Sequence, residues 1–262
     1  MWNPKQQDLI YDPDSSVSDL MVGSTFVGFP QPRLTNGKFM SQMTRTCSPV
    51  SDMHRCYFDT SLATYEGSPW LYSFYVPQDM QGLIDLQGGD SAFVERLEYF
   101  HTSGIAYMGN EPTFLTIFQF HYAGRPGKSS EWVRNYIPSH FNNSINGIPG
   151  NDDCAMGAFN GMAMMGFFPV AGQSVYLLTA PFFPEVKIQT RSDRPAIIRR
   201  RGDPKGIYIQ SVTLDGENWN RSWITHDFFL HGGTLELMMG SKENEGWGVS
   251  TVNRPPSYSP LR

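Results

Sequence analysis

The spacing of hydrophobic and polar residues changes twice along the chain. Residues 1–64 are dense in Pro, Gly, Ser, Asp and Thr and show no sustained period, which predicts long loops with one short helix. From 70 to 168 apolar residues recur at helical spacing, and after Gly172 they alternate with a period of two. The pattern therefore predicts a helical region followed by a β region.

Residues typical of helix ends divide the helical region. Ser91 after Asp90 and Pro112 after Glu111 are start signals, and Gly104 is a stop signal. The expected helical blocks are 70–86, 91–100, 112–122, 130–139 and 155–167. Five such blocks joined by polar loops indicate a helical bundle or toroid.

The β region shows six alternating segments, each bounded by Gly, Pro, Asp or Asn. They read SVYLL, EVKIQ, AIIRR, IYIQSVTL, SWITHDFFL and TLELMM. This pattern predicts a meander of antiparallel strands. We therefore expect an α+β protein with a helical part at 1–170 and an antiparallel β part at 171–262.

Composition excludes several classes of protein. Of the 262 residues, 40% are hydrophobic, 14% aromatic and 17% charged, which favours a compact fold over disorder. The net charge of −5 offers no basic field for nucleic acid. The basic run of Arg199, Arg200, Arg201 and Lys205 is interpreted as a solvated strand end or loop and not as a phosphate site. The sequence contains no run of 18 apolar residues, so it predicts no membrane span.

Cysteines and sequons point to an oxidising compartment. Cys47 and Cys56 are nine residues apart and suit a loop-closing disulfide, with Cys154 left unpaired. N-x-S sequons at Asn142 and Asn220 point the same way. Met1 is not followed by a signal-peptide pattern, so we expect an N-terminal segment of the parent protein to be missing from this chain.

Three loops concentrate acidic and amide side chains. They are YEGSPW at 65–70, GNEP at 109–112 and PGNDD at 149–153. Any one of these side chains could cap a helix or pair with an arginine. Clustered carboxylates, however, repel unless a cation, a shared proton or different roles keep them together. The acidic and amide residues concerned are Glu66, Asn110, Glu111, Asn151, Asp152 and Asp153.

The available ligands and missing motifs narrow the chemistry. Oxygen ligands without a Cys or His cluster favour calcium or magnesium over zinc, and the six histidines form no HExxH pair. GxSxG, GxGxxG and Walker motifs are absent. Paired carboxylates without a nucleotide motif fit glycoside hydrolysis. Aromatic residues such as Trp70 suit either sugar stacking or the protein core.

Several longer motifs occur together in one order. They are YEGSPWLYSFYVPQD, GNEP with YAGRP, PGNDD, GFFPVAGQ, IYIQSVTLDG and HGGTLEL. As a set they resemble glycoside hydrolase family 92, the calcium-dependent, inverting exo-α-mannosidases, and especially its fungal members. The resemblance runs over nearly the whole chain. It implies a secreted or extracellular parent enzyme that trims terminal mannose, α-1,2-linked, from N-glycans or fungal glycans.

The resemblance also implies a fold and roles for the loop residues. The family combines an N-terminal β-sandwich with an (α/α)6 barrel, so 1–170 is expected to be an incomplete barrel that lacks the sandwich and the first barrel helices. Glu66 matches the general acid and Asp153 the general base, with Asp152 beside it. Trp70, Asn110 and Asn151 are expected to bind substrate. Glu111, Asn110 and Asp153 are expected to bind Ca²⁺.

Two departures from the family keep other functions open. Relatives begin hundreds of residues earlier, and the stretch NDDCAMG is one residue shorter than usual. An inactive remnant that binds glycan weakly is therefore an alternative, as is another (α/α)6 enzyme such as a phosphorylase. An inverting hydrolase predicts a separation of about 6.5–9.5 Å between the Glu66 and Asp153 carboxyls.

Overall fold

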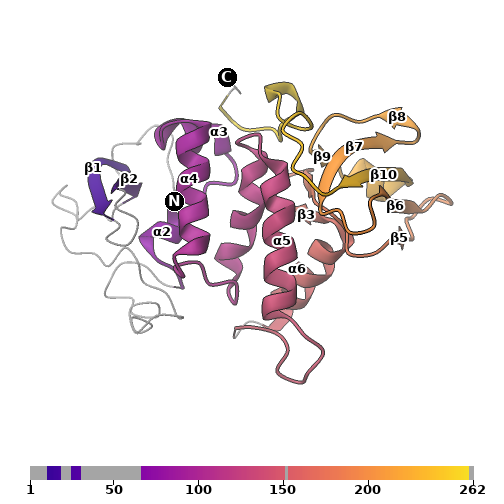
Figure 1. The fold of residues 1–262 in the computed structure, drawn as a ribbon, viewed down its shortest axis with the longest axis horizontal. Helices are drawn as coiled ribbons and strands as arrows, with labels where there is room; N and C mark the ends of the chain where they lie inside the picture. Colours follow the sequence, from indigo (N-terminus) through magenta and orange to yellow (C-terminus); the bar gives the residue numbers. More distant parts are fainter. Residues whose placement is uncertain (1–10, 19–24, 31–65, 151–152, 260–262) are drawn as a thin grey trace.

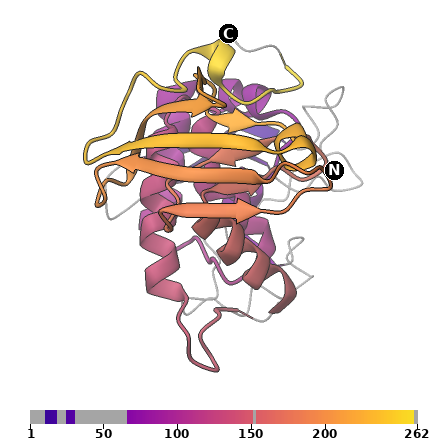
Figure 2. The same cartoon turned by 90° about the vertical axis from the view of Figure 1, so that its right-hand side faces the viewer.

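The computed structural model describes residues 11–18, 25–30, 66–150 and 153–259. A small hairpin lies at one end, a layer of helices follows it, and β-sheets cover the other end (Figure 1). Viewed from the sheet side, the strands cross in front of the helices (Figure 2). The order of helices followed by sheets is that of a mixed α+β fold, as the hydrophobic pattern predicts.

The hairpin corrects the expectation of loops with one helix before residue 65. Strand β1 (Tyr11–Ser18) pairs antiparallel with β2 (Thr25–Pro30), with a register shift between Asp12 and Ser16. The Phe26 ring lies 5.1 Å from that of Trp70 and 4.9 Å from that of Tyr99. This packing on the helical layer supplies the apolar contact that an isolated two-stranded hairpin lacks.

The helical layer follows the predicted blocks with one break. Its elements are α2 (Pro69–Tyr72), α3 (Met80–Leu86), α4 (Asp90–Thr102), the 3₁₀ helix η3 (Glu111–His121), α5 (Pro126–His140) and α6 (Asp153–Met165). The expected single helix at 70–86 is two helices. Pro77 disfavours helical backbone before it, and the Asp79 carboxylate caps α3 by accepting from Gly82 N at 3.0 Å.

Stacked aromatic rings hold together η3, α6 and β3 (Phe167–Pro169), the strand that follows α6. Phe114 stacks on Phe159 at 4.4 Å, and Phe118 stacks on Phe168 at 4.4 Å. Every residue from Thr113 to His121 is buried. A 3₁₀ helix of this length is uncommon, and the burial of these nine residues supports it.

The described strands that follow the helices form two sheets. Sheet one is β3 (Phe167–Pro169), β4 (Tyr176–Leu178) and β9 (Trp223–Ile224). Sheet two has the order β5-β6-β10-β7-β8, formed by β5 (Glu185–Ile188), β6 (Ala196–Gly202), β10 (Gly233–Gly240), β7 (Tyr208–Leu214) and β8 (Glu217–Asn218).

Two predictions for the β region are wrong. Strand β10 pairs parallel with β6, so the region is not wholly antiparallel. Of the segment SWITHDFFL only Trp223 and Ile224 form a strand, and α7 (Asp227–His231) follows. Here α7 precedes β10 and leads the chain back beside β6, so the connection between β6 and β10 is a crossover and not a hairpin.

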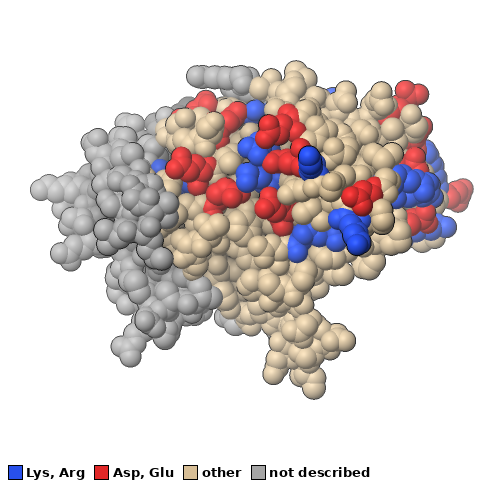
Figure 3. Space-filling view, viewed as in Figure 1, with Lys and Arg blue, Asp and Glu red and all other residues tan. Residues whose placement is uncertain are grey.

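The outer face of the five-stranded sheet carries a charge ladder. Arg199 donates to Glu185 at 2.7 Å, and Arg201 donates to Glu236 at 2.9 Å. These ion pairs are solvent-accessible, in agreement with the interpretation of Arg199 and Arg201 as a solvated strand end. Lys and Arg alternate with Asp and Glu over the visible face, without a large region of one sign (Figure 3).

The C-terminal segment ties the sheet region to the helices. The Arg254 guanidinium donates to both Asp90 carboxylate oxygens, at 3.0 and 2.8 Å, and to Tyr122 O and Val249 O. Ser257 and Ser259 donate to the buried Asp79 carboxylate. Among the described residues, no helix has the length and apolar character needed to cross a membrane.

Replacing Arg254 should test this tie. Arg254→Ala removes a forked ion pair with a mostly buried guanidinium, and we expect a loss of about 2–4 kcal/mol in the free energy of unfolding. Arg254→Lys should recover less than half, because an ammonium cannot form the fork. Arg201→Ala, at a half-exposed pair, should cost under about 1 kcal/mol. Denaturant titration measures all three, and equal losses for Arg254→Ala and Arg201→Ala would contradict the tie.

Two buried histidines predict acid sensitivity. Burial lowers the pKa of His101 to about 3 and that of His121 to about 4. The unfolded chain takes up protons near pH 6.5 whereas the folded chain does not, so stability is complete above about 6.5 and falls toward pH 4. We expect a loss of about 2 kcal/mol per histidine between pH 7 and 5.

The pH dependence of the unfolding free energy should distinguish the contribution of the buried histidines from that of exposed ones. His101→Gln should remove about half of the loss in unfolding free energy between pH 7 and 5. His231→Gln, at an exposed position, should leave that loss unchanged. An identical pH slope in wild type and His101→Gln would show that His101 is not the titrating group.

Candidate functional site

A hydrogen bond joins two of the three predicted loops. Asn110 Nδ2 donates to the backbone carbonyl of Glu66 at 3.0 Å. Asn110 is 3% exposed and precedes η3, whereas Glu66 is partly exposed and precedes α2. Glu66 has a left-handed backbone, with φ of 56°. Non-glycine residues rarely adopt this conformation, and it is concentrated at functional sites.

Two glycines join the second loop to the third. A Cβ built on Gly109 would lie 2.8 Å from Gly150 Cα, and a Cβ on Gly150 would meet the Gly109 carbonyl. Gly150 also has a φ of +85°. Because only glycine permits both this backbone and this approach, the contact between GNEP and PGNDD depends on these two residues. The three loops therefore meet at one end of the helical layer.

The positions next to these contacts include the predicted acidic residues. Glu111 is the first residue of η3 and is partly buried. Asp153 is the first residue of α6, three residues after Gly150. Asn151 and Asp152 lie outside the described residues, as does the side chain of Asp153. The separation of the Glu66 and Asp153 carboxyls remains a prediction. The proposed Cys47–Cys56 disulfide also lies outside the described residues.

Two tyrosines lie beside the loops. Burial and then the negative charge of Glu66 raise the pKa of Tyr72. Its ring lies 2.9 Å from where a Gly67 Cβ would stand. The Tyr107 phenol crowds Gly109 in the same way, and burial raises its pKa. Tyr107 is not among the site residues predicted above, although it lies only two residues before the GNEP loop.

Trp70 does not occupy the position predicted for it. Its side chain is fully buried, between the rings of Phe26, Phe74 and Tyr99. A ring without exposed surface cannot stack on a sugar. We therefore correct the substrate-binding prediction and assign Trp70 to the core, which its helical spacing also allowed.

The donor set at the loops suits a hard cation. Asn110 and Glu111, two of the three predicted ligands, offer oxygen atoms, as calcium prefers. Within the described ranges, no three His, Cys, Asp or Glu side chains gather into a metal-binding group. The described residues thus fit calcium by donor type, and their role as ligands remains a prediction.

Comparison with known proteins identifies the family. The model of the glycosyl hydrolase family 92 catalytic domain matches residues 1–241. The chain belongs to glycoside hydrolase family 92. A relative named "Uncharacterized secreted glycosidase", from Arthroderma benhamiae, is 48% identical over 238 residues, which are 88% of this chain and 30% of the relative.

Solved structures of family 92 share the fold. The α-mannosidase BT3965 of Bacteroides thetaiotaomicron aligns with a TM-score of 0.76 and 27% identity, over 88% of this chain and 31% of that enzyme. The family 92 glycosyl hydrolase ccman5 aligns with a TM-score of 0.75 and 21% identity, over 94% and 36%, and supports the fold alone. The chain thus spans about a third of the length of these relatives.

Substituting single glycines should test the contact between the family 92 loops. Gly150→Ala is expected to cost more than about 3 kcal/mol in unfolding free energy, because left-handed strain adds to a backbone clash. Gly104 has a φ of +80° with open space around it, so Gly104→Ala should cost only about 1 kcal/mol. Thermal or denaturant unfolding gives the difference. Equal costs would show that the approach of Gly109 does not constrain position 150.

Proposed function

We propose that the parent protein is an inverting α-mannosidase that releases terminal mannose, α-1,2-linked, from N-glycans or fungal glycans. The observation that carries the proposal is the meeting of the GNEP loop with both EGSPW and PGNDD in a family 92 chain. Loops on a rigid scaffold can aim groups from distant sequence positions at one ligand. The likeness to an α-mannosidase structure supports the choice of sugar.

In the proposed reaction two carboxyl groups act on opposite sides of the glycosidic bond. Glu66 donates its proton to the leaving oxygen as the bond to the anomeric carbon breaks. Asp153, with Asp152 beside it, removes a proton from the water that attacks this carbon from the other face. The proton lost by Glu66 leaves with the released alcohol, and the proton gained by Asp153 restores the balance. Mannose is released with inverted configuration.

The left-handed backbone of Glu66 has a clear use in this scheme. Asn110 holds the Glu66 carbonyl, and the first turn of α2 follows directly, with Leu71 N donating to Ser68 Oγ at 3.3 Å. The backbone that follows the acid is therefore held by both contacts. Fixing a catalytic group in this way reduces the conformational freedom lost on reaching the reactive geometry.

Family 92 enzymes are generally calcium-dependent, and calcium is part of the proposal. Asn110, Glu111 and Asp153 would hold it, with Asn110 and Asn151 also contacting substrate. When bound, calcium would orient sugar hydroxyls and offset negative charge among the loops. Asn110 is buried, so its side chain would act from a fixed position.

We propose further that residues 1–170 form part of an (α/α)6 barrel and 171–262 a β-rich region. A β-sandwich and further barrel helices in the parent chain would complete the site. The relative from Arthroderma benhamiae is named as secreted, and the sequons at Asn142 and Asn220 suit an extracellular parent.

Substrates with different leaving groups should reveal the roles of the two carboxyl groups. With a mannobiose, Glu66→Gln should lower kcat by at least about 100-fold, since the leaving alcohol needs a proton. With an activated nitrophenyl mannoside, Glu66→Gln should lose much less, whereas Asp153→Asn should lose activity on both. Glu95→Gln, at an exposed position on α4, is the control.

The assay measures mannose release by this chain, with and without a chelator, and follows the anomer formed by NMR. Release of β-mannose that stops on chelation supports the proposal. Phosphate-dependent formation of mannose phosphate would support the phosphorylase alternative instead. No turnover by the chain would favour the remnant alternative.

A further inference from the structure

Two arginines outside the candidate site share one backbone carbonyl. Arg134 on α5 and Arg200 on β6 both donate to Pro181 O, the second at 3.0 Å. Among the residues that the structure describes, neither forms an ion pair with a carboxylate. Burial and the charge of Arg200 lower the pKa of Arg134 to about 10. Two like charges thus lie close together with only neutral acceptors.

Each of the two guanidinium groups has some N–H groups without an acceptor among the described residues. Arg134 Nε is buried and has no partner among the described residues. Arg200 directs Nη2 to Pro204 O at 3.0 Å and Gly206 O at 2.7 Å, and Nη1 to Pro181 O. Within that part of the chain, its Nε–H and one Nη1–H have no acceptor. A guanidinium has five N–H groups in a fixed plane, suited to two oxygens of one anion.

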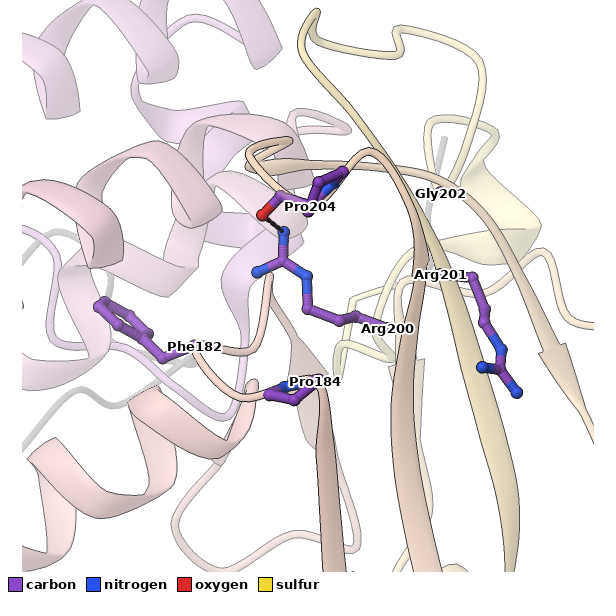
Figure 4. Close-up of a pocket in the computed structure, with 6 residues that line it drawn as sticks. All are labelled: Phe182, Pro184, Arg200, Arg201, Gly202 and Pro204. Carbon is purple, nitrogen blue, oxygen red and sulfur yellow. Dashed lines mark hydrogen bonds between the residues drawn. The ribbon is translucent and has the colours of Figure 1, made fainter.

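A cavity opens beside Arg200. It has a volume of about 340 Å³ and is lined by Phe182, Pro184, Arg200, Arg201, Gly202 and Pro204. In Figure 4 the guanidinium of Arg200 turns toward Pro204 on the side of Phe182 and Pro184, whereas Arg201 points away. The Arg134 guanidinium lies over the Phe182 ring, 3.9 Å from its centroid, which fixes that wall. The cavity is of the size of small-ligand sites.

We propose that this cavity binds the oxyanion of a small molecule, a phosphate or a carboxylate, at Arg200, with Arg134 close by as a second positive charge. The anion would supply the missing negative charge and accept the unused N–H groups of Arg200, while Phe182 and Pro184 would contact an attached organic group. The site is separate from the EGSPW, GNEP and PGNDD loops, so it does not depend on the proposed hydrolysis. The proposal revises the interpretation of Arg200 as part of a solvated strand end. That interpretation still holds for its neighbours Arg199 and Arg201 in β6.

Thermal unfolding with added anions tests the proposal. Inorganic phosphate or glucuronate at millimolar concentration should raise Tm progressively, beyond sodium chloride of equal ionic strength. A response to phosphate alone identifies a phosphate ligand, and a response to glucuronate alone identifies a sugar acid. A Tm that rises no more than in chloride for either anion overturns the proposal.

Variants locate the effect. Arg200→Gln should abolish the anion-specific rise, and Arg134→Gln should reduce it by removing the second positive charge. Arg199→Gln should keep it, because Arg199 lies on the same strand but pairs with Glu185 on the other face. A rise that persists in Arg200→Gln, or is undiminished in Arg134→Gln, contradicts the assignment. Should Arg200→Gln fail to fold, crystals of the wild-type chain soaked in tungstate give a direct answer. Density beside Arg134 and Arg200 supports the site, and an empty cavity overturns it.

Discussion

The meeting of three loops depends on one close backbone approach, between Gly109 and Gly150. A single hydrogen bond, such as that from Asn110 to Glu66, contributes only about 1 kcal/mol net. A left-handed backbone at a non-glycine residue costs about as much or more. The loops are therefore not held by their own contacts alone. They are held because the elements that follow them, α2, η3 and α6, are fixed in the core.

That core explains why the site end of the helical layer can be rigid. The stacked rings of Phe114, Phe118, Phe159 and Phe168 join η3 to α6 and β3. Trp70 and Phe26 do the same for α2 and the hairpin. Each acidic loop lies directly before an element anchored in this way. The aromatic side chains named here pack in the core, and this packing fixes the elements that position the loops.

The sequence predicted helix positions that local patterning determines, and it did not predict strand pairings that depend on tertiary contacts. Helix α4 lies within two residues of its predicted block because Asp90 and Gly104 mark its ends. The parallel pairing of β6 with β10 could not be predicted, since alternation is the same in both directions. For the site, the sequence motifs predicted Glu66 and Asn110. Only the structure shows that the Asn110 side-chain amide donates to the backbone carbonyl of Glu66.

Arg200 shows most clearly how alternation can hide a functional candidate. Three consecutive arginines look alike in a sequence, yet successive side chains of a strand point to opposite faces. Arg199 and Arg201 therefore pair with Glu185 and Glu236 on the solvent-accessible face. The Arg200 side chain points to the other face, toward Arg134, which lies 66 positions earlier in the chain. The two guanidinium charges share one acceptor atom, and two unit charges that close repel by roughly a few kcal/mol at an effective dielectric constant of about 20. The shared Pro181 carbonyl offsets only part of such repulsion, so an anion in the neighbouring cavity would add stability where the fold alone leaves a deficit.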